Sequence, residues 1–153
     1  KGLAHNERVR IWKEWMTARG QKVDKDMCLV HESFIHLDPK AGKARLKAFV
    51  NKVTAVIATD DAYLPELHRS LLGLGLKVPS QMSLAGINNT TVNQKSILPA
   101  TSIEISPFRH GAFCFDTLFQ LLTGRIDRVV ESAPIELIER DSARRPRKKM
   151  KVI

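Results

Sequence analysis

The sequence has 153 residues, of which 43% are hydrophobic and 27% are charged, which is ordinary for one soluble globular domain. No apolar run reaches the roughly 20 residues of a transmembrane helix, and the first five residues do not resemble a signal peptide. Residues 140–153 carry +6 of the formal net charge of +9, so the other 139 residues are nearly balanced. We therefore expect a solvated basic tail at residues 147–153 rather than a nucleic acid-binding surface.

The first 52 residues are expected to form a helix, a short strand and a second helix. Apolar residues recur along one broad face of residues 5–19, and Gly20 is a suitable helix end. Residues 27–30 are a short apolar run that indicates a strand, and Pro39 precedes a second helix at residues 41–52. The side chains expected to face inward are Val9, Trp12, Trp15, Met16, Ala44, Ala48 and Phe49.

The stretch from residue 53 to residue 90 has the pattern strand, helix, strand. Residues 53–58 are a short apolar run rich in β-branched side chains, which predicts a covered strand. Leucines then recur at helical spacing up to Gly73, and residues 82–87 form a second apolar run. A right-handed crossover makes two such strands parallel.

Polar residues follow these two strands at equivalent places. Asp60 comes just after the first strand, and Asn88 comes directly after the second. Ligands of open parallel sheets are held at the carboxyl edge of the strands, so we expect the two side chains to project into one hollow. Each could also cap the helix or turn that follows it.

The remaining elements complete an α/β fold, with a parallel sheet flanked by helices. We expect a loop at residues 89–100, a strand at 101–105, a helix at 108–123 and a last strand at 135–140. Apolar side chains cover most of the circumference of the helix, and burying each large one is worth about 1.5 to 3 kcal/mol. We expect this helix to pack against a second copy or against protein outside this chain.

Five motifs in a fixed order resemble the LacI/GalR family of bacterial transcription regulators. Arg8 opens R-V-R-I-W, which is similar to the family's R-x-x-G-F, although Ile11 replaces the glycine. T-D-D, a leucine helix and M-S-L-A-G-I-N-N-T follow, and then L-P-A-T-S-I. The helix between Gly111 and Gly124 resembles G-x-x-A-x-x-L-L, and L-I-E-R-D-S resembles the closing L-x-x-R-x-S-T. The resemblance covers residues 8 to 146.

This resemblance implies a periplasmic-binding-protein-like type I lobe with part of a second lobe. Residues 1–104 and 133–146 would form mainly one lobe, and residues 105–132 a segment of the other, so that residues 1–146 are the C-terminal portion of an effector-binding and dimerisation domain. The implied protein is a cytoplasmic bacterial regulator, such as a repressor, that forms a homodimer. It would bind a small sugar-like effector in a cleft between lobes, and operator DNA through an N-terminal helix-turn-helix absent from this chain.

The same resemblance implies four effector-binding residues. Arg8 would lie at the cleft, where its planar fork can hold two hydroxyls or a carboxylate. Asp60 and Asn88 would hydrogen-bond sugar hydroxyls, although most sugar-sensing members carry an aspartate in place of Asn88. Phe34 lies where many members place an aromatic ring that stacks on the ligand. A surface arginine, two capping residues and a core aromatic are the corresponding structural interpretations.

Two other functions are compatible with the same fold. An extracytoplasmic solute-binding protein of a transporter shares the fold and the cleft, and a domain with a degenerate site would only dimerise. No nucleophile motif indicates an enzyme, and no cofactor is implied. His31, His36 and Asp38 lack the spacing of a metal site. Cys28 and Cys114 have no CxxC partner, so we expect buried, reduced thiols and a cytosolic protein.

Overall fold

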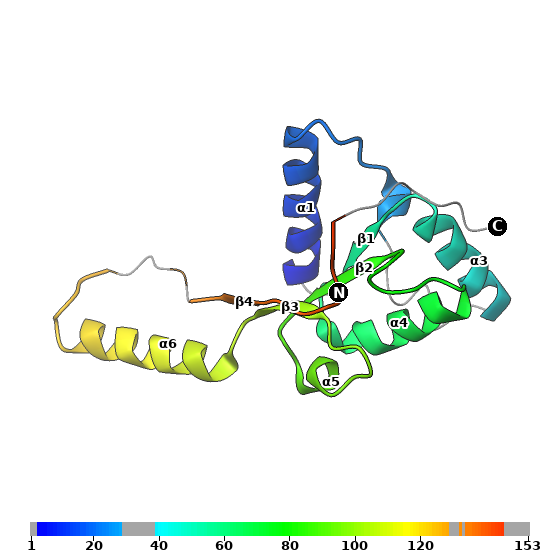
Figure 1. Ribbon diagram of the computed structural model, residues 1–153. Helices are drawn as coiled ribbons and strands as arrows, with labels where there is room; N and C mark the ends of the chain where they lie inside the picture. Colours follow the sequence, from blue (N-terminus) through cyan, green and yellow to red (C-terminus); the bar gives the residue numbers. More distant parts are fainter. Residues whose placement is uncertain (1–2, 29–38, 129–131, 133, 146–153) are drawn as a thin grey trace.

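The computed structural model describes residues 3–28, 39–128, 132 and 134–145 of the chain (Figure 1). Helices and strands alternate through most of it, which confirms the predicted α/β class. The elements are α1 (Leu3–Ala18), η1 (Lys25–Met27), α3 (Pro39–Val50), β1 (Ala55–Ile57), η2 (Asp61–Tyr63), α4 (Leu64–Gly73), β2 (Ser83–Ile87), α5 (Thr91–Gln94), β3 (Thr101–Glu104), α6 (Pro107–Leu122) and β4 (Glu136–Ile138).

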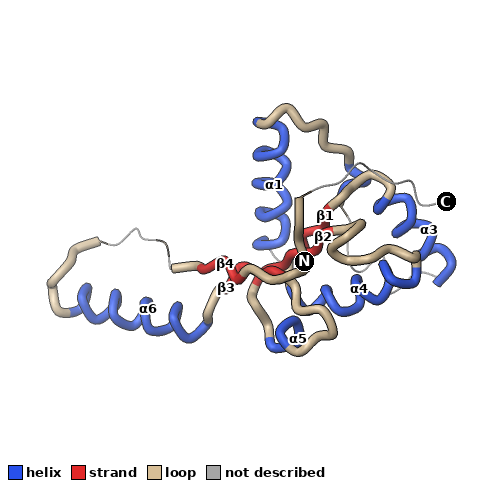
Figure 2. Tube along the Cα trace, viewed as in Figure 1, coloured by secondary structure: helices blue, strands red, loops and turns tan. Residues whose placement is uncertain are grey.

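The four strands form one sheet in the order β1-β2-β3-β4 (Figure 2). β1 and β2 are parallel neighbours with Val56 opposite Leu84, as the strand-helix-strand pattern predicts. β2 and β3 are also parallel, so the carboxyl ends of three strands lie at one edge. β4 runs antiparallel to β3, with Ile103 opposite Leu137. The chain therefore leaves this edge after β3 and comes back to it before β4.

The hydrophobic core lies where α3 and α4 meet the sheet. Leu71 of α4 is completely buried and Leu84 of β2 is 1% exposed. From α3 the buried side chains are Leu46, Phe49 and Val50. The prediction for this helix was correct for Phe49 and wrong for two small residues, Ala44 and Ala48, which are exposed. An alanine buries little area, so the three large side chains determine which face turns inward.

Two further predictions about the first third need correction. Lys25–Met27 form a turn of 3-10 helix, so the strand predicted for residues 27–30 is wrong at Met27, and residues 29–30 lie outside the described residues. Trp15 was expected to be buried, yet 53% of it is exposed. The guanidinium of Arg19 stacks on its ring 3.4 Å from the centroid, which gives the indole a cation–π partner at the surface.

Both cysteines are free thiols, as predicted, but their burial differs from the expectation. Cys114, on α6, is exposed, so the prediction of a buried thiol is wrong there. Cys28 is half-buried, and this burial raises the pKa of its thiol, although the charge of Lys13 acts in the opposite direction. No helix in the described ranges has the length and apolar character that crossing a bilayer requires.

Helix α6 stands apart from the rest of the described chain (Figure 1). None of its residues is buried against the described residues. Its outward side carries five large apolar side chains that are 49% to 86% exposed: Phe108, Phe115, Leu118, Phe119 and Leu122.

Candidate functional site

Asp60 and Asn88 meet at the carboxyl edge of β1 and β2. The side-chain Nδ2 of Asn88 donates to Oδ2 of Asp60 at 3.0 Å. This contact follows from the topology, because both residues come after the carboxyl ends of neighbouring parallel strands. The predicted proximity of these two residues is confirmed.

Asp60 also begins the next turn of the chain. Its Oδ1 accepts a hydrogen bond of 2.8 Å from the backbone N–H of Ala62, so the carboxylate caps η2. A carboxylate has about four lone-pair positions, and two donors occupy only part of this capacity. The capping interpretation and the binding interpretation are therefore compatible for Asp60.

The backbone of Asn88 has an unusual conformation. Its φ is 97°, in the left-handed region, and its N–H donates to the carbonyl of Ile103 at 2.8 Å. Asparagine tolerates this region better than most residues. The hydrogen bond to β3 continues the pairing of β2 and β3 by one residue, and the left-handed turn then sends the chain out of the sheet.

Arg8 reaches the same edge from α1. Its Nη1 donates to the backbone carbonyl of Thr59 at 2.6 Å, and Thr59 directly precedes Asp60. Ile11, which replaces the family glycine on α1, is 52% exposed. Arg8 thus contacts the end of β1 although Ile11 stands in place of the family glycine. The structure thus brings together three of the four predicted site residues, Arg8, Asp60 and Asn88, whereas Phe34 lies outside the described residues.

The buried carboxylate of Asp61 holds two segments together at this edge. Asp61 is completely buried, and its Oδ2 accepts from the N–H of Thr90 at 3.3 Å and from Nδ2 of Asn93 at 2.9 Å. Its Oδ1 has no hydrogen-bond partner among the described residues. A Cβ on Gly86 would lie 1.9 Å from this Oδ1, so the glycine is required by the close approach of the carboxylate. Asp61 thus ties the end of β1 to the loop that follows β2.

A second polar network, which the motifs did not reveal, lies beside Asn88. Asn89 donates from Nδ2 to Oε2 of Glu104 at 2.9 Å and accepts at Oδ1 from Nη2 of Arg140 at 2.6 Å. These residues are 15 and 51 positions away from Asn89 along the chain. Local sequence patterns cannot detect such contacts, although the polar pair Asn88-Asn89 at a strand end was a signal that could have drawn attention to Asn89.

The chemistry of this edge suits a polar ligand that is rich in hydroxyl groups. Asp60 offers a carboxylate acceptor, Asn88 offers an amide, and Arg8 offers a guanidinium with further N–H donors. Donors and acceptors that converge from different elements are the usual means of orienting a polar ligand. No group of three or more potential metal-binding side chains occurs among the described residues, and His31, His36 and Asp38 lie outside them.

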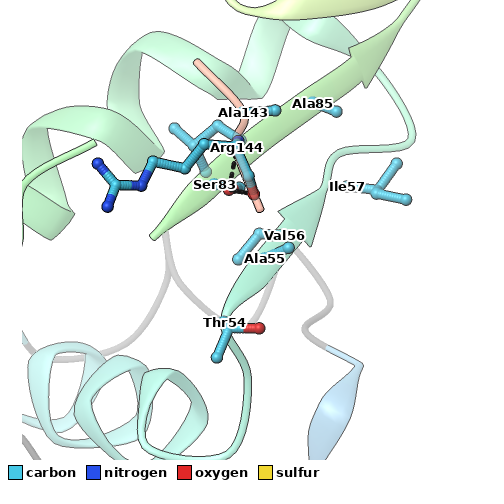
Figure 3. A pocket seen from close by; sticks show the side chains of 9 residues that line it. Thr54, Ala55, Val56, Ile57, Ser83, Ala85, Ala143 and Arg144 are labelled. Carbon is cyan, nitrogen blue, oxygen red and sulfur yellow. Dashed lines mark hydrogen bonds between the residues drawn. The ribbon is translucent and has the colours of Figure 1, made fainter. Parts of the chain in front are cut away.

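A hollow of about 300 Å³ lies elsewhere, beside β1 (Figure 3). β1, the start of β2 and Ala143-Arg144 line it, and its wall is mainly apolar. Ser83 Oγ accepts from the N–H of Arg144 at 3.1 Å and donates to its carbonyl at 3.3 Å, so this serine is already paired. None of the predicted site residues lines the hollow. It lacks converging polar groups, and we therefore assign the candidate site to the carboxyl edge.

Comparison with known proteins gives one family and a set of similar folds. A family model described as a periplasmic binding protein-like domain matches residues 2–143. No curated protein sequence matches the chain. Solved structures resemble it over most of its length. Three of them, CelR, the lac repressor and ascG, share 19% to 23% sequence identity with it.

Three transcription regulators illustrate this similarity. The CelR–cellobiose complex has a TM-score of 0.67 and 23% identity over 90% of this chain and 42% of its own. The lac repressor dimer bound to operator and the anti-inducer ONPF has a TM-score of 0.67 and 20% identity, over 93% and 49%. The Escherichia coli repressor ascG has a TM-score of 0.68 and 19% identity, over 92% and 51%. The chain therefore spans about half the length of the structures that it resembles.

Proposed function

This chain belongs to the periplasmic binding protein-like domain family, and from this premise we propose that it is the effector-sensing part of a LacI/GalR-like transcription regulator. Three observations support the proposal. The motif order covers residues 8 to 146, the fold matches regulators such as CelR and ascG, and polar side chains converge at the carboxyl edge of the sheet. The protein would act by binding, with no catalytic step.

We propose a sugar or a related polyhydroxylated metabolite as the effector. The observation that carries this proposal is the Asp60–Asn88 pair with Arg8 beside it, because this set contains acceptors and donors for several hydroxyl groups. Solved structures with similar folds contain cellobiose in one case, and sucrose or glucose in a Lactobacillus casei regulator. Phe34 is proposed to add a stacking surface.

The proposal also covers the lobes and the partners. Residues 1–104 and 133–146 would form mainly one lobe and residues 105–132 a segment of the other, with the effector between them. The outward face of α6 would be covered by the second lobe or by a second copy in a homodimer. Operator DNA would be bound by a helix-turn-helix outside this chain, in the cytoplasm of a bacterium. The effector would shift the arrangement of the lobes, and with it the spacing of the DNA-reading heads.

A thermal-shift screen of the intact protein tests the site. Cellobiose, sucrose, glucose, sugar phosphates and nucleosides are each added at saturating concentration. A ligand present at 100 times its Kd stabilises the folded state by about 2.7 kcal/mol. Because Asp60 supplies the carboxylate acceptor, Asp60→Ala is expected to remove this stabilisation. A shift that Asp60→Ala leaves unchanged would remove Asp60 from the site.

Asp127→Ala is the matched control for this screen. Asp127 is an exposed aspartate beyond α6, so its substitution removes the same charge away from the carboxyl edge. We expect the control to keep the full ligand-induced shift. A loss of the shift in both variants would indicate a general effect of charge.

A further inference from the structure

Asn89 has hydrogen-bond partners for all four of its polar groups. Its backbone N–H donates to Oγ of Ser102 at 3.0 Å, and its carbonyl accepts from Nε2 of Gln94 at 2.7 Å. Its side chain donates to Glu104 at 2.9 Å and accepts from Arg140 at 2.6 Å. An exposed loop asparagine with no positional role would not have every group paired in this way.

The amide of Asn89 is the group that this position requires. An amide can donate to the carboxylate of Glu104 and accept from the guanidinium of Arg140 at the same time. A carboxylate at residue 89 could still accept from Arg140, but it would repel Glu104. An apolar side chain would leave both charged partners without this contact. The contacts of Asn89 therefore depend on its chemistry as well as on its size.

The two partners belong to the two segments that flank α6 in the sequence. Glu104 is the last residue of β3, directly before the segment that leads to α6. Arg140 follows β4, opposite the start of β3, and its Nη1 also donates to the carbonyl of Ala100 at 2.6 Å. One side chain thus joins the end of β3 and the segment after β4 to the loop that carries Asn88.

The backbone gives a second, independent indication. Asn88 and Asn89 are consecutive residues with φ values of 97° and 46°, and the structure describes no other non-glycine residue in the left-handed region. Such conformations persist where the surroundings hold them in place. The contacts of Asn89 supply that constraint, because they anchor the loop to β3 and to the segment after β4.

We propose that Asn89 is a positioning residue: it holds Asn88 in the conformation that pairs with Asp60, and it links the candidate effector site to the end of β3, where the chain leaves for α6, and to the segment after β4. This inference rests on the proposed function of the Asp60–Asn88 site. It adds a residue that contacts no effector itself but through which the end of β3 and the segment after β4 would influence the site.

Hydrogen exchange of the ligand-free, intact protein tests the positioning role. Asn89→Asp removes the donor to Glu104, so we expect the backbone amides of residues 86–94 to exchange about tenfold faster, as the loss of one charge-assisted hydrogen bond would produce. Amides of α4 should be unaffected. Unchanged exchange at residues 86–94, or equally faster exchange throughout the protein, would overturn the proposal.

Two further variants separate positioning from a general loss of structure. Glu104→Gln alone keeps an acceptor for Asn89, so exchange should stay within about twofold of the parent protein. In the double variant Asn89→Asp/Glu104→Gln the amide and the carboxylate exchange places. The amide introduced at position 104 can then donate to the carboxylate introduced at position 89, so slow exchange should return. Absence of this rescue would contradict the inference. If Asn89→Asp does not fold, Glu104→Ala removes the same hydrogen bond and replaces it in the test.

A ligand titration of the same variants keeps the two proposals distinguishable. If cellobiose, sucrose or glucose binds the parent protein, Asn89→Asp should weaken that binding and the double variant should restore it. If none of the three binds, the proposed effector class is at fault, while the exchange measurement still decides the role of Asn89. Restored exchange without restored binding would mean that Asn89 orders the loop but does not position the site.

Discussion

At the scale of single residues, Asp61 and Gly86 depend on each other. The carboxylate of Asp61 is completely buried, and it holds the loop after β2 through Thr90 and Asn93. The position next to its Oδ1 can contain only a glycine, since a Cβ on residue 86 would lie 1.9 Å from that oxygen. The close approach of Gly86 therefore leaves room for the carboxylate of Asp61 to hold the loop after β2.

Gly86→Ala should therefore destabilise the protein by about 2 kcal/mol or more, because the carboxylate must move and lose its hydrogen bonds. Chemical denaturation of the variant measures this change. The control is Gly73→Ala in α4, where an added Cβ meets nothing within 4 Å. Alanine in a helix should be neutral or stabilise by roughly 0.5–1 kcal/mol. Equal effects of the two substitutions would disprove the close contact.

The residues of the site were only partly predictable. Asp60 and Asn88 could be paired from sequence because each follows a strand, and parallel neighbours bring such positions together. Arg8 was identified by resemblance alone. Asn89 and Arg140 were not assigned to the site, because their contact joins residues 51 positions apart and depends on a left-handed backbone that no local pattern specifies.

At the scale of elements, α6 is the feature that calls for further protein. Phe115 is 68% exposed and Leu122 is 78% exposed on its outward side, whereas Phe113 on the opposite side is half-buried. Exposure of such a large apolar face to water is unfavourable for an isolated helix. We infer that the face is covered in the intact protein, by the second lobe or by a second copy.

Phe115→Ser tests this inference in the intact protein. If the face is covered, the loss of a buried aromatic should lower the free energy of unfolding by about 3 kcal/mol. Gln120→Ser, on the opposite side of α6, should change it by no more than about 0.5 kcal/mol. Denaturation curves give both values, and sedimentation shows whether a dimer dissociates. An effect of Phe115→Ser as small as that of the control would mean that the face is free.

The elements themselves were predicted well where the periodicity was strong. The leucine spacing of α4 and the apolar runs of β1 and β2 gave elements of the correct type, with ends within about three residues. The failure at Met27 has a simple cause, since a run of four apolar residues fits a strand or a single helical turn equally well. The predicted inward face of α3 is wrong at Ala44 and Ala48, because an apolar periodicity gives alanines the same weight as larger side chains.

At the scale of the whole molecule, the order of the sheet creates the site. Three parallel strands place their carboxyl ends at one edge, and β4 pairs antiparallel beside β3 after the chain has formed α6. The parallel pairs followed from the sequence pattern, but the direction of β4 did not, because a single short strand carries no information about its partner. The end of β3, where the chain leaves for α6, therefore lies next to the polar network of Asn89.

The most direct test of the account is a crystal structure of the intact protein with the sugar that gives the largest thermal shift. The account predicts that hydroxyl groups of the sugar lie within hydrogen-bonding distance of the Asp60 carboxylate and the Arg8 guanidinium, at the carboxyl edge of β1 and β2. A sugar bound in the apolar hollow beside β1, or no bound sugar at saturating concentration, would contradict it.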